Sequence, residues 1–192
     1  MCVAYDMAED FRARAMEFLR DGLAQGFQVR YLGGGSDGEL WEQLAEVLDL
    51  GAALRHGAVG IMPQASMCDA DGNLDPEDQV RAYAAATSDA LDSGFAGLRV
   101  AIEASALVRS RQHVDAFTRS EHLVDRYMTT QPFSALCGYD RWELGAATVS
   151  ELACMHPVCN LGATPFRIYA TTGADLALGG EIDLSVQAQF TH

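Results

Sequence analysis

The chain has 192 residues, of which 49% are hydrophobic and 21% charged, a balance typical of one globular domain with a short appendage. No apolar run approaches the length that crosses a bilayer, and the formal net charge of −14 at pH 7 repels a phosphate backbone, so we expect binding neither to membranes nor to nucleic acids. The N-terminus is neither basic nor continuously apolar, so it does not have the pattern of an export signal. The five cysteines are therefore expected to be reduced thiols in a cytoplasmic protein.

The first third of the chain alternates between short β-like runs and amphipathic helices. Apolar residues recur at helical spacing from Ala8 to Gln25, and Gly26 then provides a natural helix end. A second apolar stripe runs from Leu40 to Leu48. In chain order, the predicted segments are a strand at 3–5, a helix at 8–25, a strand at 27–32, a helix around 40–48 and a strand at 58–62.

The middle of the chain continues this alternation. Asp75 is a suitable N-cap, Pro76 suits the first helical position and Asp78 is the acid three residues after the cap, so a helix is predicted from there to Gly94. The next predicted segments are a strand at 98–102, a helix at 113–129, a strand at 133–139 and a helix at 144–155. Strands joined by helices of this length predict an α/β fold with a mostly parallel sheet covered on both faces.

The last part of the chain has a different pattern. Two short β-like runs, at 166–169 and 176–184, flank a turn-forming stretch at 171–175 with no helix between them. This pattern predicts a C-terminal β-hairpin-like tail. We therefore expect a boundary near 162–165, which divides the chain into a domain at 1–162 and a segment at 163–192.

The glycine-rich run GGGSDG at 33–38 formally satisfies the G-x-G-x-x-G pattern between a strand and a helix, where backbone amides can hold a phosphate. However, it follows the second strand rather than the first, and the next strand ends without the acidic residue that would hold a ribose. No lysine follows the glycines to contact a triphosphate. A glycine turn is therefore the preferred interpretation, with a nucleotide-binding switch as an alternative.

A segment rich in thiols carries Cys154, His156 and Cys159, whose side chains suit zinc or haem iron. Cys137 is the best additional ligand, because an adjacent parallel strand can bring it near. The preferred interpretation is structural: buried cysteines on a helix and a strand, and a histidine that caps a turn. The alternative is a metal or haem site whose ligands come from Cys2, Cys137, Cys154, His156 and Cys159.

Glu121 occupies a position that the helical pattern assigns to the core. The apolar stripe of the helix at 113–129 runs through Val114, Phe117, Glu121 and Val124. A carboxylate in the core needs a partner, and either Arg99 or a bound ligand can provide one. The other interpretation places Glu121 at the edge of the stripe, in contact with water.

The strand at 133–140 ends in residues that suit a binding pocket. Its alternation places Cys137 and Tyr139 on one face at the carboxyl end, where open α/β sheets bind their ligands. Glu103 ends another strand, and we expect it to face the same crevice. No Ser-His-Asp or Cys-His-acid trio can be identified from spacing, so binding is expected rather than catalysis.

Taken together, these segments resemble the MEDS family, the methanogen/methylotroph sensory domain named for the regulator of dichloromethane metabolism. The resemblance covers about residues 1–162. The residues that carry it are Cys2 with Tyr5, the run 18–23 followed by Gly26, the run 98–100 with Glu103, Ser120 with Glu121, the run ALCGYD at 135–140, and His156 with Pro157. It implies a RecA/KaiC-like sheet with a degenerate phosphate-binding loop. It also implies sensing of small molecules, proposed to be simple hydrocarbon derivatives, and relay of the signal to attached output domains.

The run at 175–185 resembles the opening strands of a STAS domain, the anti-sigma-factor antagonist module. Such modules follow MEDS domains in some regulators. The resemblance therefore implies a regulatory protein partner of the anti-sigma or histidine-kinase type.

The expected function is a sensory domain, not an enzyme, with an unidentified small molecule as ligand and no assigned cofactor. The alternatives are a thiol, metal or haem redox sensor and a RecA-like nucleotide switch. The predicted ligand-binding residues are Tyr5, Glu103, Glu121, Cys137, Tyr139 and His156.

Overall fold

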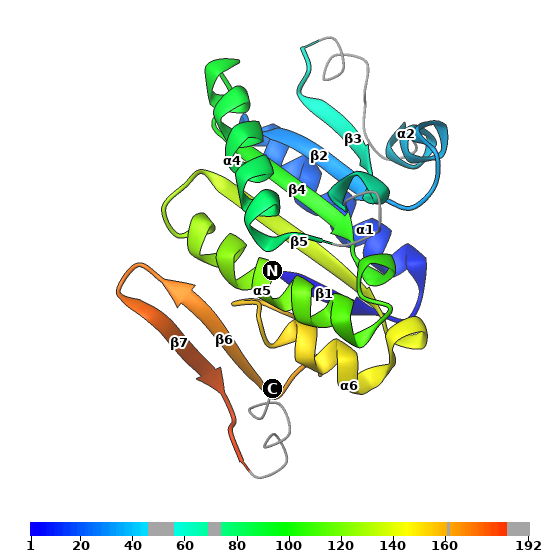
Figure 1. Cartoon of the computed structure of the whole chain (residues 1–192). Helices are drawn as coiled ribbons and strands as arrows, with labels where there is room; N and C mark the ends of the chain where they lie inside the picture. The colour runs from blue at the N-terminus through cyan, green and yellow to red at the C-terminus, as the bar shows by residue number, and fades with distance from the viewer. Residues whose placement is uncertain (46–55, 69–73, 161, 184–192) are drawn as a thin grey trace.

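The computed structural model describes residues 1–45, 56–68, 74–160 and 162–183. In this part of the chain, five strands form a parallel sheet in the order β1-β5-β4-β2-β3, as Figure 1 shows. The α/β class and the parallel sheet predicted from the sequence are confirmed. The five strands are β1 (Cys2–Tyr5), β2 (Gln28–Gly33), β3 (Val59–Pro63), β4 (Leu98–Glu103) and β5 (Phe133–Asp140).

Helices cover both faces of this sheet (Figure 1). One apolar cluster joins α1 and α2 to one face, and a second joins α4, α5 and α6 to the other. None of the helices in the described ranges is long and apolar enough to cross a membrane. The helices are α1 (Ala8–Ala24), α2 (Asp37–Ala45), α4 (Pro76–Asp92), α5 (Arg111–Met128) and α6 (Arg141–Ala153), with short 3₁₀ turns η1 (Gln64–Met67) and η2 (Ser105–Leu107).

Side-chain caps determine where three of these helices begin. The Asp75 carboxylate accepts hydrogen bonds from two main-chain N–H groups, which starts α4 where the sequence predicted. Ser110 accepts one from the N–H of His113, so α5 begins two residues earlier than predicted. Asp140 caps α6 in the same way, and Gly145 then interrupts the helix with a φ of 76°. The sequence predicted that this helix begins at residue 144, which lies next to the break.

The C-terminal segment forms its own two-stranded antiparallel sheet from β6 (Phe166–Thr171) and β7 (Ala174–Gly180). The predicted hairpin is thus present, although β7 begins and ends earlier than the sequence suggested, and residues 184–192 lie outside the described ranges. Hydrogen bonds join the hairpin to the preceding part of the chain: the Ala170 N–H donates to the Asp125 carboxylate, the Ile168 N–H to the Cys154 carbonyl, and the Arg167 guanidinium to the Pro157 carbonyl.

The register of the central strands decides which side chains share a face. Cys137 on β5 lies beside Cys2 on β1 and Ile102 on β4, while Gly138 lies beside Glu103. Because neighbouring residues on a strand point to opposite faces, Cys137 faces α5 and Gly138 faces α1. A Cβ on Gly138 would lie 2.5 Å from Cδ2 and Cε2 of Phe11, so α1 packs directly against the strand at this point.

This contact generates a stability prediction. Gly138→Ala should lower the free energy of unfolding by about 1–3 kcal/mol, because the new methyl group forces α1 away from β5. The matched control is Gly60→Ala on β3, where the atom nearest to the new Cβ would be Arg30 Cγ at 3.6 Å, an ordinary contact. Urea denaturation of both variants checks the difference, and equal stability of the two would contradict the tight contact.

Candidate functional site

A cluster of polar side chains is buried between α5 and the sheet. Its members are Glu121, Cys137, Tyr139 and His156, none of which exposes more than 8% of its surface. The Cys137 thiol donates to Glu121 Oε1 across 3.5 Å, and the Tyr139 hydroxyl and His156 Nε2 are hydrogen-bonded at 2.9 Å. His156 Nε2 also lies 3.6 Å from Glu121 Oε2. Four of the six residues predicted for the ligand site are therefore brought together.

Three separate elements supply this cluster. Cys137 and Tyr139 alternate on β5, so both point towards α5. Glu121 occupies the buried stripe of α5, as the helical pattern predicted. His156 lies in the turn that follows α6, where its main-chain N–H donates to the Ala153 carbonyl.

Burial disfavours the charged forms of these groups. Removal from water raises the pKa of Glu121 to about 7, and it raises the pKa values of Cys137 and Tyr139 well above their usual range. The same desolvation lowers the pKa of His156 well below its ordinary value. Cys137, Tyr139 and His156 are therefore neutral at pH 7, whereas Glu121 is close to its midpoint, and each hydrogen bond in the cluster is made away from water.

Further thiols extend from this cluster across the sheet. Cys2 is the register partner of Cys137 on one side, and it forms a parallel bridge with Cys159 on the other. A hydrogen bond with Cys2, assisted by the charge of Arg167, lowers the pKa of Cys159 to about 6, despite the opposing effect of burial. Cys154 is directed elsewhere, because its thiol donates to the Glu151 carbonyl at 3.0 Å.

Tyr5 and Glu103 lie on the opposite face of the sheet, so the expectation of one shared crevice is wrong. The Tyr5 hydroxyl donates to Glu103 Oε1 at 2.9 Å, and the Tyr5 ring stacks on Phe11 of α1. Gln64 Nε2 and the Ser105 N–H also donate to the Glu103 carboxylate. The physical reason is the register: Glu103 pairs with a residue adjacent to Cys137 and therefore faces the other way.

Arg99 also lies on the α1 face and does not serve as the partner of Glu121. Its guanidinium sits 5.1 Å from the ring centroids of both Phe18 and Phe27. It donates to the Phe18 carbonyl and to the side chain of Gln25. The two residues on either side of Arg99 in β4 face α4 and α5. Because side chains alternate along a strand, Arg99 points to the opposite face.

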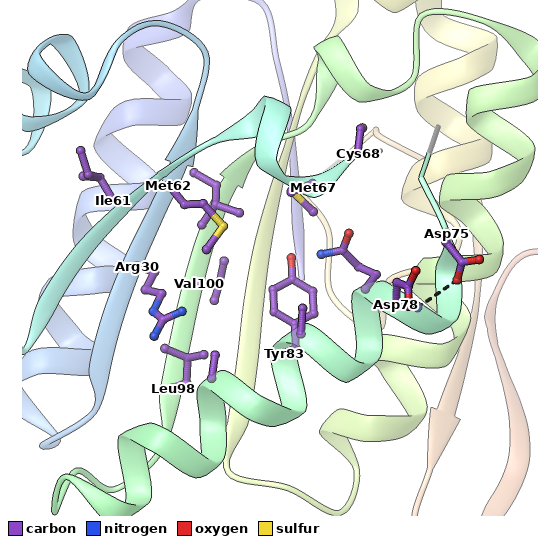
Figure 2. Close-up of a pocket in the computed structure, with 14 residues that line it drawn as sticks. Arg30, Ile61, Met62, Met67, Cys68, Asp75, Asp78, Tyr83, Leu98 and Val100 are labelled. Carbon is purple, nitrogen blue, oxygen red and sulfur yellow. Dashed lines mark hydrogen bonds between the residues drawn. The ribbon is translucent and has the colours of Figure 1, made fainter. Parts of the chain in front are cut away.

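Sequence reasoning missed a cavity of about 490 Å³ between α4 and the sheet (Figure 2). Tyr83 projects from α4 into the space between helix and sheet, with Met62 and Met67 on other sides of it. Polar groups are few and lie mainly on α4 and at Arg30 of β2. The lining residues are Arg30, Leu32, Ile61, Met62, Met67, Cys68, Asp75, Asp78, Gln79, Ala82, Tyr83, Ala86, Leu98 and Val100.

The signal for this cavity is present in α4, although it is subtle. Gln79, Tyr83, Ala86 and Ala90 follow the inward stripe of the helix, where large aliphatic residues would otherwise fill the core. Small and polar residues at these positions leave volume beneath the helix. None of the residues predicted for the ligand site lines the cavity.

Tyr83 connects the cavity with the buried cluster. Its ring lies 4.8 Å from that of Phe133 on β5. Burial raises the pKa of Tyr83, and the nearby Cys137 and Glu121 raise it further. The cavity and the cluster are thus neighbouring parts of one layer beneath α4 and α5.

The glycine-rich turn leads from β2 into α2, as predicted, and one of its amides, that of Ser36, donates to a carboxylate. Glu39 accepts hydrogen bonds from both the N–H and the hydroxyl of Ser36. All thirteen basic residues in the sequence are arginine, so no lysine can complete a phosphate loop. These features favour a capped turn over a phosphate site.

The family model described as "MEDS: MEthanogen/methylotroph, DcmR Sensory domain" matches residues 1–157. The chain belongs to the MEDS family. Membership in this family of sensory domains indicates a sensory, regulatory role for the chain. The match includes both the cavity and the buried cluster, whereas Cys159 and the β6–β7 hairpin lie after it. A search of curated proteins finds no match.

The buried cluster of this MEDS domain generates a second stability prediction. Tyr139→Phe should lower the free energy of unfolding by about 1–3 kcal/mol, because His156 Nε2 loses a hydrogen-bond partner that water cannot replace. Tyr127→Phe is the control: it keeps the ring contact with Phe133 and removes a hydroxyl from a half-buried residue. Thermal or urea unfolding measures both, and a neutral effect of Tyr139→Phe would show that the hydrogen bond does not stabilise the cluster.

Proposed function

We propose that this MEDS domain senses a small, mostly apolar molecule that binds in the cavity between α4 and the sheet. The observation that carries the proposal is the cavity itself, whose volume of about 490 Å³ lies in the range of small-molecule sites. Its wall is largely aliphatic and thioether, with Met62 and Met67 providing adaptable surface. A family of sensory domains is the setting in which such a cavity is useful.

The polar groups in the wall define the chemistry of the ligand. The Tyr83 hydroxyl and the Gln79 amide interact with one another at the α4 side, and both can donate or accept a hydrogen bond. Arg30 adds a cationic donor from β2. A short hydrocarbon with one hydroxyl, carbonyl or halogen substituent satisfies this arrangement, whereas a multiply charged nucleotide does not.

Signal relay follows from how α4 is held. Ligand beneath α4 strengthens its packing on the sheet, and α4 lies beside α5, which binds the hairpin through Asp125. A ligand that binds one arrangement of these helices more tightly than another shifts the population towards it. The proposed output is a regulatory protein or module next to the hairpin, and the proposal assigns no catalytic step to the domain.

Methionine methyl groups provide a direct binding test. With [¹³C-methyl]methionine in the chain, dichloromethane and 1-butanol should each shift the methyl signals of Met62 and Met67 saturably. Met16, buried under α1 on the opposite face, should keep its signal position. Uniform small shifts of all methionines, or none at saturating probe, would contradict binding in this cavity.

A pair of neighbouring alanines on α4 provides matched variants. Ala86→Leu adds bulk to the cavity wall and should weaken the binding of the same probes by about tenfold or more, since a displaced or crowded ligand loses on the order of 1.4 kcal/mol. Ala85→Leu adds the same atoms to the exposed face of the helix and should leave affinity unchanged. Equal affinities of both variants would place the ligand elsewhere.

A second candidate function is thiol-based redox sensing. The main-chain β-bridge that places Cys2 beside Cys159 favours it. Cys159 has a pKa of about 6 and is mostly thiolate at pH 7. Attack of this thiolate on a peroxide gives a sulfenic acid, which the Cys2 thiol then converts to a disulfide. In total, the two thiols lose two protons and two electrons, and hydrogen peroxide is reduced to two waters.

Alkylation distinguishes this candidate from simple packing of the thiols. Iodoacetamide at pH 7 should modify Cys159 before the buried Cys154, whose pKa burial raises to about 11, and peroxide pretreatment should block the reaction at Cys159. Peptide mass spectrometry identifies the site and the disulfide. Faster labelling of Cys154 than of Cys159, or peroxide treatment without a Cys2–Cys159 disulfide, would exclude the redox role.

A further inference from the structure

Among the described residues, one group of side chains has the composition and spacing of a transition-metal site. Glu121, Cys137 and His156 each offer one ligand atom, and these atoms all lie within 4.8 Å of one another. They come from three elements far apart along the chain: α5, β5 and the turn after α6. We propose that these three residues bind a divalent transition-metal ion, with Zn²⁺ as the best match.

The distances fit a tetrahedral ion closely. With metal–ligand bonds of about 2.0–2.3 Å, a tetrahedral site separates its ligand atoms by about 3.3–3.8 Å. Cys137 Sγ and Glu121 Oε1 are 3.5 Å apart, and His156 Nε2 and Glu121 Oε2 are 3.6 Å apart. The two distances end on different oxygens of the Glu121 carboxylate, and an ion between the three residues would draw their side chains closer together.

The donor set selects the type of metal. A thiolate, an imidazole nitrogen and a carboxylate suit Zn²⁺ and its analogue Co²⁺, whereas Mg²⁺ and Ca²⁺ prefer oxygen ligands alone. Coordination replaces the protons of Cys137 and Glu121, which pass to solvent, with one divalent cation. The two negative ligands and the ion then sum to zero, which is the charge balance that an apolar core favours.

Tyr139 occupies the neighbourhood of the fourth coordination position. Its hydroxyl lies 2.9 Å from His156 Nε2, the atom that would bind the ion. When His156 Nε2 binds the ion, this hydrogen bond is broken and the Tyr139 oxygen remains beside the ion. Tyr139 then serves as a positioning residue. Tyr83 lies between this cluster and the cavity, but the metal site does not depend on a ligand in that cavity.

This set of ligands differs from the one that sequence reasoning considered as an alternative. Glu121 replaces Cys154, whose thiol is bound to the Glu151 carbonyl. Cys2 and Cys159 are paired with one another beside Cys137. The two ligand sets therefore make opposite predictions for Cys154→Ser, because only the alternative set uses this thiol.

Cobalt binding tests the site in the complete chain. Metal-free protein titrated with Co²⁺ should bind one equivalent, with visible bands of a tetrahedral ion and a near-ultraviolet thiolate-to-cobalt band. Cys137→Ser should abolish the thiolate band and weaken binding. The loss should exceed the factor of about 10–100 that is typical when an outer-shell partner is removed. Cys154→Ser, the matched thiol control, should retain both the band and the affinity.

Glu121→Gln keeps the proposal testable if Cys137→Ser does not fold, because it preserves the shape of the side chain. It should retain the thiolate band and weaken binding, while circular dichroism confirms that the fold is intact. Zn²⁺ should displace Co²⁺ from the same site. Absence of stoichiometric Co²⁺ binding, or a thiolate band that survives in Cys137→Ser, would overturn the proposal.

Discussion

The Phe11 ring of α1 occupies the space where a side chain on Gly138 would be. This contact seats α1 on β5, and everything on the other face of the strand depends on it. With Gly138 turned towards α1, Cys137 and Tyr139 must point towards α5, where they meet Glu121 and His156. Gly138 thus lies against the Phe11 ring on the α1 face, while Cys137 and Tyr139 bring polar groups to the α5 face.

Local patterns in the sequence were sufficient for the secondary structure and the fold class. Asp75 and Pro76 specify the start of α4, and the apolar stripe of α5 correctly places Glu121 in the core. The six candidate residues could not be assigned to one site from such patterns, because a common crevice requires the strand order and the register. Glu103 failed for this reason: it is paired with Gly138, and no spacing along the chain encodes that pairing.

The cavity and the thiol arrangement were beyond sequence reasoning for different reasons. A cavity is volume left by residues that are too small, and Ala82 and Ala86 are ordinary helix formers until their surroundings are known. Cys2 lies between two thiols on opposite sides of β1, Cys137 on β5 and Cys159 after α6. Long-range pairing of this kind is a property of the folded sheet alone.

The layer beneath α4 and α5 links these features into one sensory domain of the MEDS family. Tyr83 lines the cavity and lies near Cys137 and Glu121, so one side chain borders both features. Asp125, one helical turn after Glu121 on α5, accepts a hydrogen bond from β6. A change beneath the helices therefore has a physical route to the hairpin.

A crystal structure under xenon pressure would show whether the cavity accepts a small apolar molecule. Xenon occupies apolar cavities without requiring a specific polar partner. We expect xenon density bounded by Met62, Tyr83 and Val100. A structure in which that space is collapsed, or contains only ordered water at the same pressure, would contradict it.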